Sequence, residues 1–364
     1  DWNSYRSTFE EEASRVISRE VQVDGDVKLH LLPTPYFRLE KVRISEAAST
    51  QTNLTDPFFR ADSLSVKLSI APMFRGIVEA NEIEFQRPIL RVVQDAKGEW
   101  NWQGFARALG GAAYMPANVT LTSLKIADGI LALHGTDGQE RGRLEGLKGE
   151  LSAPALNGPY RFRGSFHAGG AERELRLATA TPEADGSVRM RASLRFAESG
   201  ATYVLDARVA ELMGKPSVNG ELTARLPIAG LWDTQPSAKK PSKTSKPDEE
   251  HDLGSGDAAF DLKANVAADV DGASLSDIAL SFEQGGRPQL VTGTVHTSWQ
   301  KALTLDMKLA SRWLDLDRIT AATEGSAPYT GLAKMAGGLR DVLPAFPSRI
   351  AFAIDQANLG GEVI

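Results

Sequence analysis

The chain has 364 residues, of which 42% are hydrophobic and 24% charged, so it holds enough apolar material for a sizeable core and lacks a disordered composition. Its formal net charge of −6 argues against a nucleic-acid partner. The absence of cysteine excludes disulfides and cysteine-ligated metals, and the sequence holds no run of about eighteen apolar residues that could form a transmembrane helix.

Residues 1–19 predict an amphipathic helix. Apolar and aromatic side chains, beginning with Trp2, Tyr5 and Phe9, recur at steps of three and four, and charged residues occupy the other side. We expect this stripe to pack on a sheet. A second possibility is that Trp2 and Tyr5 rest at a membrane interface.

Alternating apolar and polar residues then predict strands, because a period of two gives each strand one apolar face. These runs cover residues 21–31, 37–44, 64–70, 77–85 and 90–92. Pro72 and Pro88 separate the last three runs. Three strands at this spacing indicate an antiparallel meander.

Three ordered motifs in this part of the chain resemble the N-terminal region of AsmA-family proteins. They read ADSLSVKLSIAPMFRG from Ala61, EIEFQRPILRV from Glu82 and DAKGEWNW from Asp95. The resemblance extends upstream to the predicted helix and weakens beyond about Trp102. It implies a bacterial envelope protein that is anchored in the inner membrane and projects a long β-groove into the periplasm. It also implies that a membrane anchor precedes residue 1 and that further groove or a tail follows residue 364.

A short internal repeat follows. Ile83–Val92 aligns without gaps on Leu124–Leu133, with Pro88 matched to Gly129, which indicates that a sheet grows by similar units. Further strands are predicted up to residue 226 and again from residue 259, with Gly-rich turns between them. Short helices are predicted at residues 105–109 and 332–343, and a helical turn at 311–319.

The chain divides into four segments by pattern and composition. Residues 1–110 form an AsmA-like N-terminal module of helix and β-meander, and 111–232 continue the sheet. Residues 233–256 are rich in Pro, Ser, Lys and acid without an apolar period, which predicts a flexible linker or insertion. Residues 257–364 add further strands and a short helix, truncated at the C-terminus.

No pattern for catalysis, a cofactor or a metal is present in the sequence. The five histidines are scattered, and neither a GxSxG elbow nor a phosphate-binding loop occurs. The glycines from Gly254 to Gly256 mimic a dinucleotide fingerprint, but no strand precedes them. Asp315 and Asp317 are interpreted as part of a solvated face. We therefore expect a protein that is not an enzyme, with no catalytic residue.

Many strands with one apolar face must cover that face with a second sheet, with helices or with a ligand. A β-sandwich is one solution. The other is a mostly-β, elongated antiparallel sheet curled into an apolar groove, with an N-terminal helix and a few short helices, which is the taco-like shape implied by the resemblance. We favour the groove. The predicted lining residues are Val27, Leu29, Leu31, Leu64, Val66, Leu68, Ile70, Ile83, Phe85, Leu124 and Ile126.

The function expected from groove and resemblance together is non-enzymatic binding and transfer of lipid between the inner and outer membranes, contributing to outer-membrane biogenesis. The partners expected are a phospholipid or another membrane lipid, the inner membrane through the missing anchor, and an envelope protein. The alternative is a periplasmic scaffold for outer-membrane protein assembly that has no lipid cargo and binds through strand edges.

Overall fold

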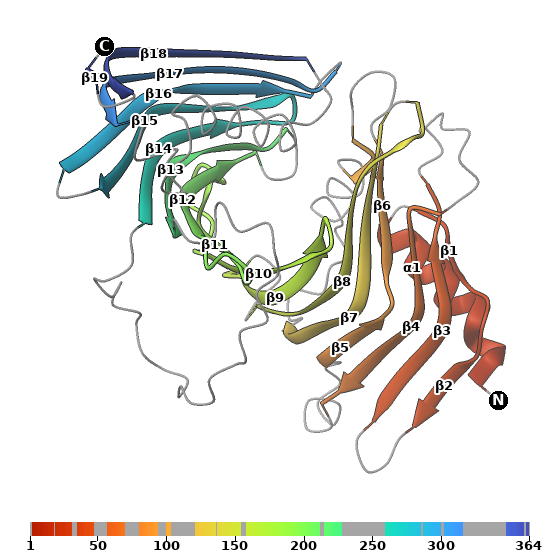
Figure 1. The fold of residues 1–364 in the computed structure, drawn as a ribbon. Coiled ribbons are helices and arrows are strands. Elements are labelled where there is room, and N and C mark those ends of the chain that lie inside the picture. The colour runs from red at the N-terminus through yellow and green to blue at the C-terminus, as the bar shows by residue number, and fades with distance from the viewer. Residues whose placement is uncertain are drawn as a thin grey trace. The chain divides into compact units, whose positions relative to one another are not determined.

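Most of the protein is β-sheet in the computed structural model (Figure 1). The structure describes residues 2–17, 19–30, 35–46, 57–69, 80–93, 100–102, 121–135, 137–153, 158–211, 215–227, 259–284, 287–299, 302–315, 347–359 and 362–363. Within these residues, 19 strands belong to one sheet, preceded by a 3-10 turn, η1 (Trp2–Tyr5), and a helix, α1 (Arg6–Ile17). The predicted mostly-β class with an N-terminal helix is confirmed. No helix of the described residues is long and apolar enough to cross a membrane.

Contacts divide the chain into two compact units, which are described separately. Residues 1–194 and 206–218 make up the first unit, and residues 195–205 and 219–364 the second. The predicted linker at 233–256 lies outside the described residues, as do the predicted helices at 105–109 and 332–343. The segment boundaries expected from composition stay predictions.

The strands up to the middle of the chain are β1 (Val21–Val23), β2 (Val27–His30), β3 (Tyr36–Ile44), β4 (Phe59–Leu68), β5 (Ala80–Gln86), β6 (Ile89–Val93), β7 (Leu121–His134), β8 (Glu140–Ala153), β9 (Arg161–Ala168) and β10 (Ala171–Thr179). They are followed by β11 (Val188–Phe196), β12 (Thr202–Ala210), β13 (Ser217–Pro227), β14 (Ala259–Ala268), β15 (Gly272–Gln284), β16 (Arg287–Ser298), β17 (Thr304–Asp315), β18 (Ser348–Leu359) and β19 (Glu362–Val363).

The helix α1 packs on the first strands and builds the core of the first unit. Val21, Val23, Val27, Leu39 and Val42 are buried there, and two side chains of α1 pack against them. These are Phe9, whose ring centroid lies 5.5 Å from that of Phe37, and Ala13. Burial of this stripe against the sheet is what the sequence predicts for the helix.

Polar side chains of the N-terminal segment also cap backbone groups of β1 and β2. Ser14 Oγ accepts a hydrogen bond of 2.8 Å from the N–H of Val21, and Glu10 Oε1 one of 2.6 Å from Val23. Both strands pair with β3, so these N–H groups belong to the edge that faces away from β3. An exposed strand edge is a template for unwanted pairing, and here side chains occupy it.

The strand order corrects the predicted antiparallel meander. β4 pairs antiparallel with both β5 and β6, which occupy successive halves of one strand position and are separated at Arg87 and Pro88. On their other side, β5 and β6 both pair parallel with β7. Antiparallel pairing continues from β7 through β8 and β9 to β10. The sheet is therefore mixed rather than wholly antiparallel.

The sequence repeat coincides with the parallel pairing. Ile83 lies opposite Leu124 and Val92 opposite Leu133, so the two similar decapeptides are neighbours in the sheet with equivalent residues side by side. At the level of Pro88 and Gly129 the ladder continues through Ile130, whose N–H donates to the Pro88 carbonyl at 2.8 Å. The repeat thus marks two adjacent copies of one kind of strand.

In the second unit, β14 to β17 are antiparallel neighbours, whereas β17 and β18 are parallel. Its core contains Phe282, Val291 and Leu314. The helical turn predicted at 311–319 is wrong over 311–315, because β17 continues to Asp315 and pairs there with β18. Asp315 is also buried rather than solvated, since its N–H donates to Gln289 Oε1 at 3.0 Å and its carboxylate accepts from Asn358.

Candidate functional site

The strand register brings together the apolar residues predicted to line a groove. Eight of them fall on two adjacent cross-strand rows on one face of the first unit, which we call the apolar face. The first row runs through Leu29, Phe37, Val66, Ile83, Leu124, Leu151, Phe162 and Leu177. The second row runs through Val27, Leu39, Leu64, Phe85, Ile126, Gly149, Gly164 and Leu175.

Burial changes along these rows. Leu39 is fully buried and Val27 nearly so, because α1 covers this part of the face. From β4 onward the described apolar residues of both rows are only half-buried, and Leu133, further along β7, is 36% exposed. Within the described part of the first unit, extensive strand contacts join only neighbours in the sheet. The described residues therefore supply no second sheet over the apolar face beyond the helix, contrary to a β-sandwich.

Two glycines of the second row, on β8 and β9, make room for an aromatic ring that belongs to the first row. A Cβ atom added to Gly149 would lie 2.6 Å from Cζ of Phe162, and one added to Gly164 would lie 2.8 Å from the same atom. The ring of Phe162 therefore lies across both glycines and keeps this part of the face apolar where side chains are missing.

Some predicted lining residues are not placed. Leu31 and Ile70 lie outside the described residues, and the side chains of Leu68, Trp2 and Tyr5 are not described. Their assignment to the groove, or to the membrane interface, stays a prediction. Sequence reasoning also missed members of the two rows, such as Phe37 and Leu151, because alternation identifies the apolar side of a strand but not the residue opposite.

The ladders of four neighbouring strand positions are interrupted at one level of the sheet. No pair joins Lys41 to Asp62 between the pairs Glu40–Ser63 and Val42–Ala61, and Arg87 and Asp128 follow the pair Gln86–Ala127 without pairing. Lys41, Arg87 and Asp128 adopt φ angles of 54°, 45° and 57°, which are in the left-handed region. Residues other than glycine rarely adopt this conformation, so the backbone is locally irregular along this line.

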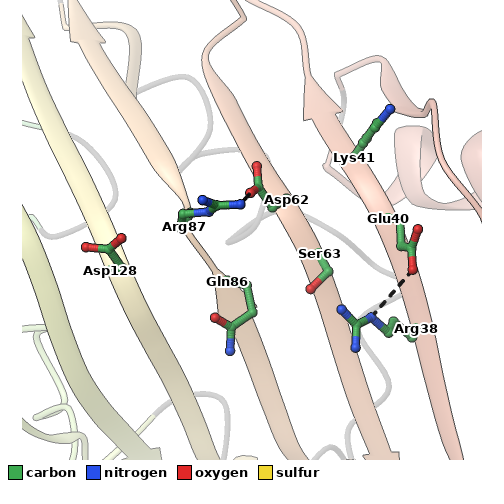
Figure 2. A pocket seen from close by; sticks show the side chains of 8 residues that line it. All are labelled: Arg38, Glu40, Lys41, Asp62, Ser63, Gln86, Arg87 and Asp128. Atoms are coloured by element: carbon green, nitrogen blue, oxygen red, sulfur yellow. Dashed lines mark ion pairs between the residues drawn. The ribbon is translucent and has the colours of Figure 1, made fainter.

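At the same level lies a polar hollow of about 650 Å³, shown in Figure 2. Its lining residues are Arg38, Glu40, Lys41, Asp62, Ser63, Gln86, Arg87 and Asp128. Charges alternate in sign from strand to strand, as Lys41, Asp62, Arg87 and Asp128.

The charges of the polar hollow largely satisfy one another. Arg87 forms an ion pair with Asp62, and Arg38 Nε lies 3.9 Å from Glu40 Oε1. Three basic and three acidic residues leave the hollow without net charge to attract an ion. No group of His, Asp or Glu residues suited to a metal occurs among the described residues. Opposite charges on adjacent strands favour one register, so the arrangement supports a structural role.

A second polar cluster gives the Trp-Asn motif of residues 100–101 a structural role. Asn101 accepts a hydrogen bond from the Val93 N–H at 3.1 Å and donates to Glu46 Oε1 at 3.0 Å. Glu46 also lies between two buried arginines, 3.9 Å from Arg19 and 3.6 Å from Arg91. Burial lowers the pKa of the Arg19 guanidinium, and the charge of Glu46 opposes this effect. The cluster joins the segment after α1 to β6 and to the end of β3.

A third polar group lies near the apolar rows but on the opposite face. Glu82 on β5 lies 2.5 Å from Lys67 and 2.5 Å from Lys125. Hydrogen bonds from Lys125 and then Lys67 hold the pKa of Glu82 below its usual range. The ionised carboxylate thus links β4, β5 and β7.

Glu82→Gln is expected to destabilise the protein because it removes the ion pairs with Lys67 and Lys125. The loss should stay below about 1 kcal/mol at pH 7, since solvent screens the two exposed lysines. Since the pKa of Glu82 is lowered in the folded protein, its stabilisation is complete above the unfolded value of about 4.3 and is lost as the pH falls below it. Urea unfolding of wild type and Glu82→Gln between roughly pH 3 and pH 7 measures the difference in their free energies of unfolding. A difference that stays constant as the pH falls would contradict the assignment.

Comparison with protein families agrees with the motifs in the sequence. Residues 1–141 match the model of the AsmA family. The similarity to this family is therefore confirmed over these residues, which include η1, α1 and β1 to β7. Neither a curated protein nor a solved structure matches the chain significantly. The family match supports an envelope-related role in lipid handling or assembly.

Proposed function

From the AsmA-family match over residues 1–141, we propose that this protein binds lipid along its apolar face and transfers it, without enzymatic chemistry, between the inner and outer membranes. The compartment would be the periplasm, with attachment to the inner membrane through an anchor. The observation that carries the proposal is the pair of apolar rows, which are covered by α1 at one end and half-buried beyond it.

The dimensions of the apolar face suit an acyl chain. From β4 to β10 the rows cross five inter-strand spacings, or about 24 Å at ~4.8 Å each. One leaflet of a bilayer has a hydrocarbon depth of about 15 Å, half of the ~30 Å core. An acyl chain can therefore lie across the strands with room to spare.

The energetics of such binding are adequate. Each CH₂ group removed from water contributes about 0.8 kcal/mol, so a chain of about sixteen carbons supplies roughly 13 kcal/mol before the costs of ordering and of the headgroup. Half-buried side chains such as Val66 and Phe85 would lose their remaining contact with water in the same event. The hydrophobic effect therefore favours an acyl chain as the cover of this face.

Mass spectrometry of lipid extracted from the purified protein tests the proposal. We expect roughly one or a few phospholipid molecules per chain, because the uncovered part of the rows is about 24 Å long. Protein free of lipid in repeated preparations, while still folded, would contradict lipid binding and favour a scaffold for outer-membrane protein assembly.

Val66→Glu is expected to remove most of the bound lipid and to leave the fold intact, because a carboxylate on a face that opens to solvent can reach water when the lipid leaves. Val66 lies on the first row between Phe37 and Ile83. Lipid content and thermal melting are measured on the same samples.

The matched control is Ser65→Glu. Ser65 is the neighbouring residue of β4 and lies on the opposite face, between Arg38 and Glu84. The Ser65→Glu variant should therefore keep its bound lipid. Collapse of the fold in Val66→Glu alone would indicate a packed interior, and a folded Val66→Glu variant with full lipid content would show that lipid lies elsewhere.

A further inference from the structure

Three arginines on β9 and β10 form an exposed basic patch that we call the arginine patch: Arg161, Arg163 and Arg176. Arg161 and Arg163 are two residues apart on one strand and therefore share a face. Arg176 lies directly opposite Arg163 on β10. The apolar residues Phe162 and Leu177 alternate with them, so the patch lies on the face opposite the apolar face.

The direct pairing of Arg163 with Arg176 is unfavourable within the protein itself. Residues that face each other on antiparallel strands have Cβ atoms about 5 Å apart, and like charges at that distance destabilise a sheet. A pair of opposed arginines therefore needs an anion, from the protein or from outside, to relieve the repulsion.

Among the described residues, no carboxylate forms an ion pair with any arginine of the patch. Glu150 lies opposite Arg163 on β8, yet its carboxylate accepts a hydrogen bond of 2.5 Å from Ser123 Oγ. The neighbours of Arg161 in the ladder are Ser152 on β8 and Ala178 on β10, which carry no charge. Lys148, two residues before Glu150 on β8, adds a further exposed cation.

Several other exposed cations of the first unit are neutralised by nearby carboxylates. Lys67 and Lys125 share Glu82, and Arg87 pairs with Asp62. On β8, Arg143 lies 2.6 Å from Glu145 and 3.1 Å from Glu140. The arginine patch differs from these positions because it presents guanidinium groups whose hydrogen-bond donors are directed to no carboxylate of the described chain.

We propose that the arginine patch binds the headgroup phosphates of an anionic phospholipid surface, so that the first unit docks on a membrane through the face opposite its apolar rows. Guanidinium groups bind phosphate oxygens through two parallel N–H donors, and several of them can share one phosphate. The whole chain carries a net charge of −6, which an anionic surface repels. A local patch of unpaired cations therefore also sets the orientation of approach.

This inference does not depend on the lipid bound to the apolar face. Lipid extraction reports on the apolar rows, whereas reversible binding to vesicles reports on the patch. Either result can fail while the other holds.

The test is co-sedimentation of the purified protein with vesicles of phosphatidylcholine alone or with added phosphatidylglycerol, at low and at high salt. We expect binding only to the vesicles with phosphatidylglycerol, weakened as the salt rises. The double variant Arg163→Gln/Arg176→Gln should bind about 25-fold more weakly, from roughly fivefold per arginine at an anionic surface.

The control Arg141→Gln/Arg143→Gln removes the same charge from paired arginines of β8, and its binding should change by less than about twofold. Equal losses in both double variants would overturn the proposal, because they would reflect net charge alone. Failure of the wild type to bind anionic vesicles, with binding of poly-glutamate instead, would also overturn it and assign the patch to an acidic protein.

Discussion

Glu46→Leu is expected to lower the free energy of unfolding by about 3–5 kcal/mol, because it removes one partner of a buried ion-pair cluster. The side chains of Arg19 and Arg91 are only 2% and 6% exposed, and that of Glu46 is 13% exposed. Asn101 would also lose its 3.0 Å hydrogen bond to Glu46. Urea unfolding of the purified variant beside wild type measures the loss.

Glu12→Gln is the matched control. Glu12 forms an ion pair of 2.7 Å with Arg15 on α1, but both side chains are at least 60% exposed. The change should cost less than about 1 kcal/mol. If Glu46→Leu were as mild as Glu12→Gln, the two buried arginines would not depend on Glu46 for their stability.

Leu39→Ala is expected to cost about 3 kcal/mol or more, because Leu39 is 0% exposed and its truncation leaves a cavity in the core below α1. The same change at Leu133, which is 36% exposed on β7, should cost less than about 1.5 kcal/mol since fewer contacts are lost. Thermal and urea unfolding of the two variants provide the comparison. Equal losses would contradict the burial gradient along the apolar face.

Much of the apolar face was predictable from the sequence. Alternation in each strand identifies one apolar side, and eight of the predicted lining residues, such as Val66 and Ile83, fall on the two rows. The repeat of 83–92 at 124–133 indicated a sheet that grows by similar units, and in the structure the residues that align are those that pair. These features were predictable because they depend on local periodicity.

Strand partners were not predictable in the same way. The three strands between Leu64 and Val92 were expected to form a meander, but β5 and β6 share one position between β4 and β7. Alternation gives a strand's apolar side and leaves its neighbour and direction undetermined. The same limit explains Asp315, whose burial depends on contacts with Gln289 and Asn358.

The line of residues with left-handed backbone had no signal in the sequence. Glycine usually marks a left-handed backbone, yet Lys41, Arg87 and Asp128 occupy these positions. The alternating charges in the polar hollow become visible only after the register is known. The arginine patch is similar, because Arg163 and Arg176 meet only through the pairing of β9 with β10.

The central claim is that lipid covers the apolar face, and photocrosslinking in cells tests it most directly. A benzophenone side chain is introduced in place of Phe85, which lies on the second row, or in place of Glu84, the adjacent residue on the opposite face. After irradiation, mass spectrometry of the purified protein should find a lipid adduct in the Phe85 variant and none in the Glu84 variant. Equal adducts at both positions, or none at Phe85 in folded protein, would contradict the claim.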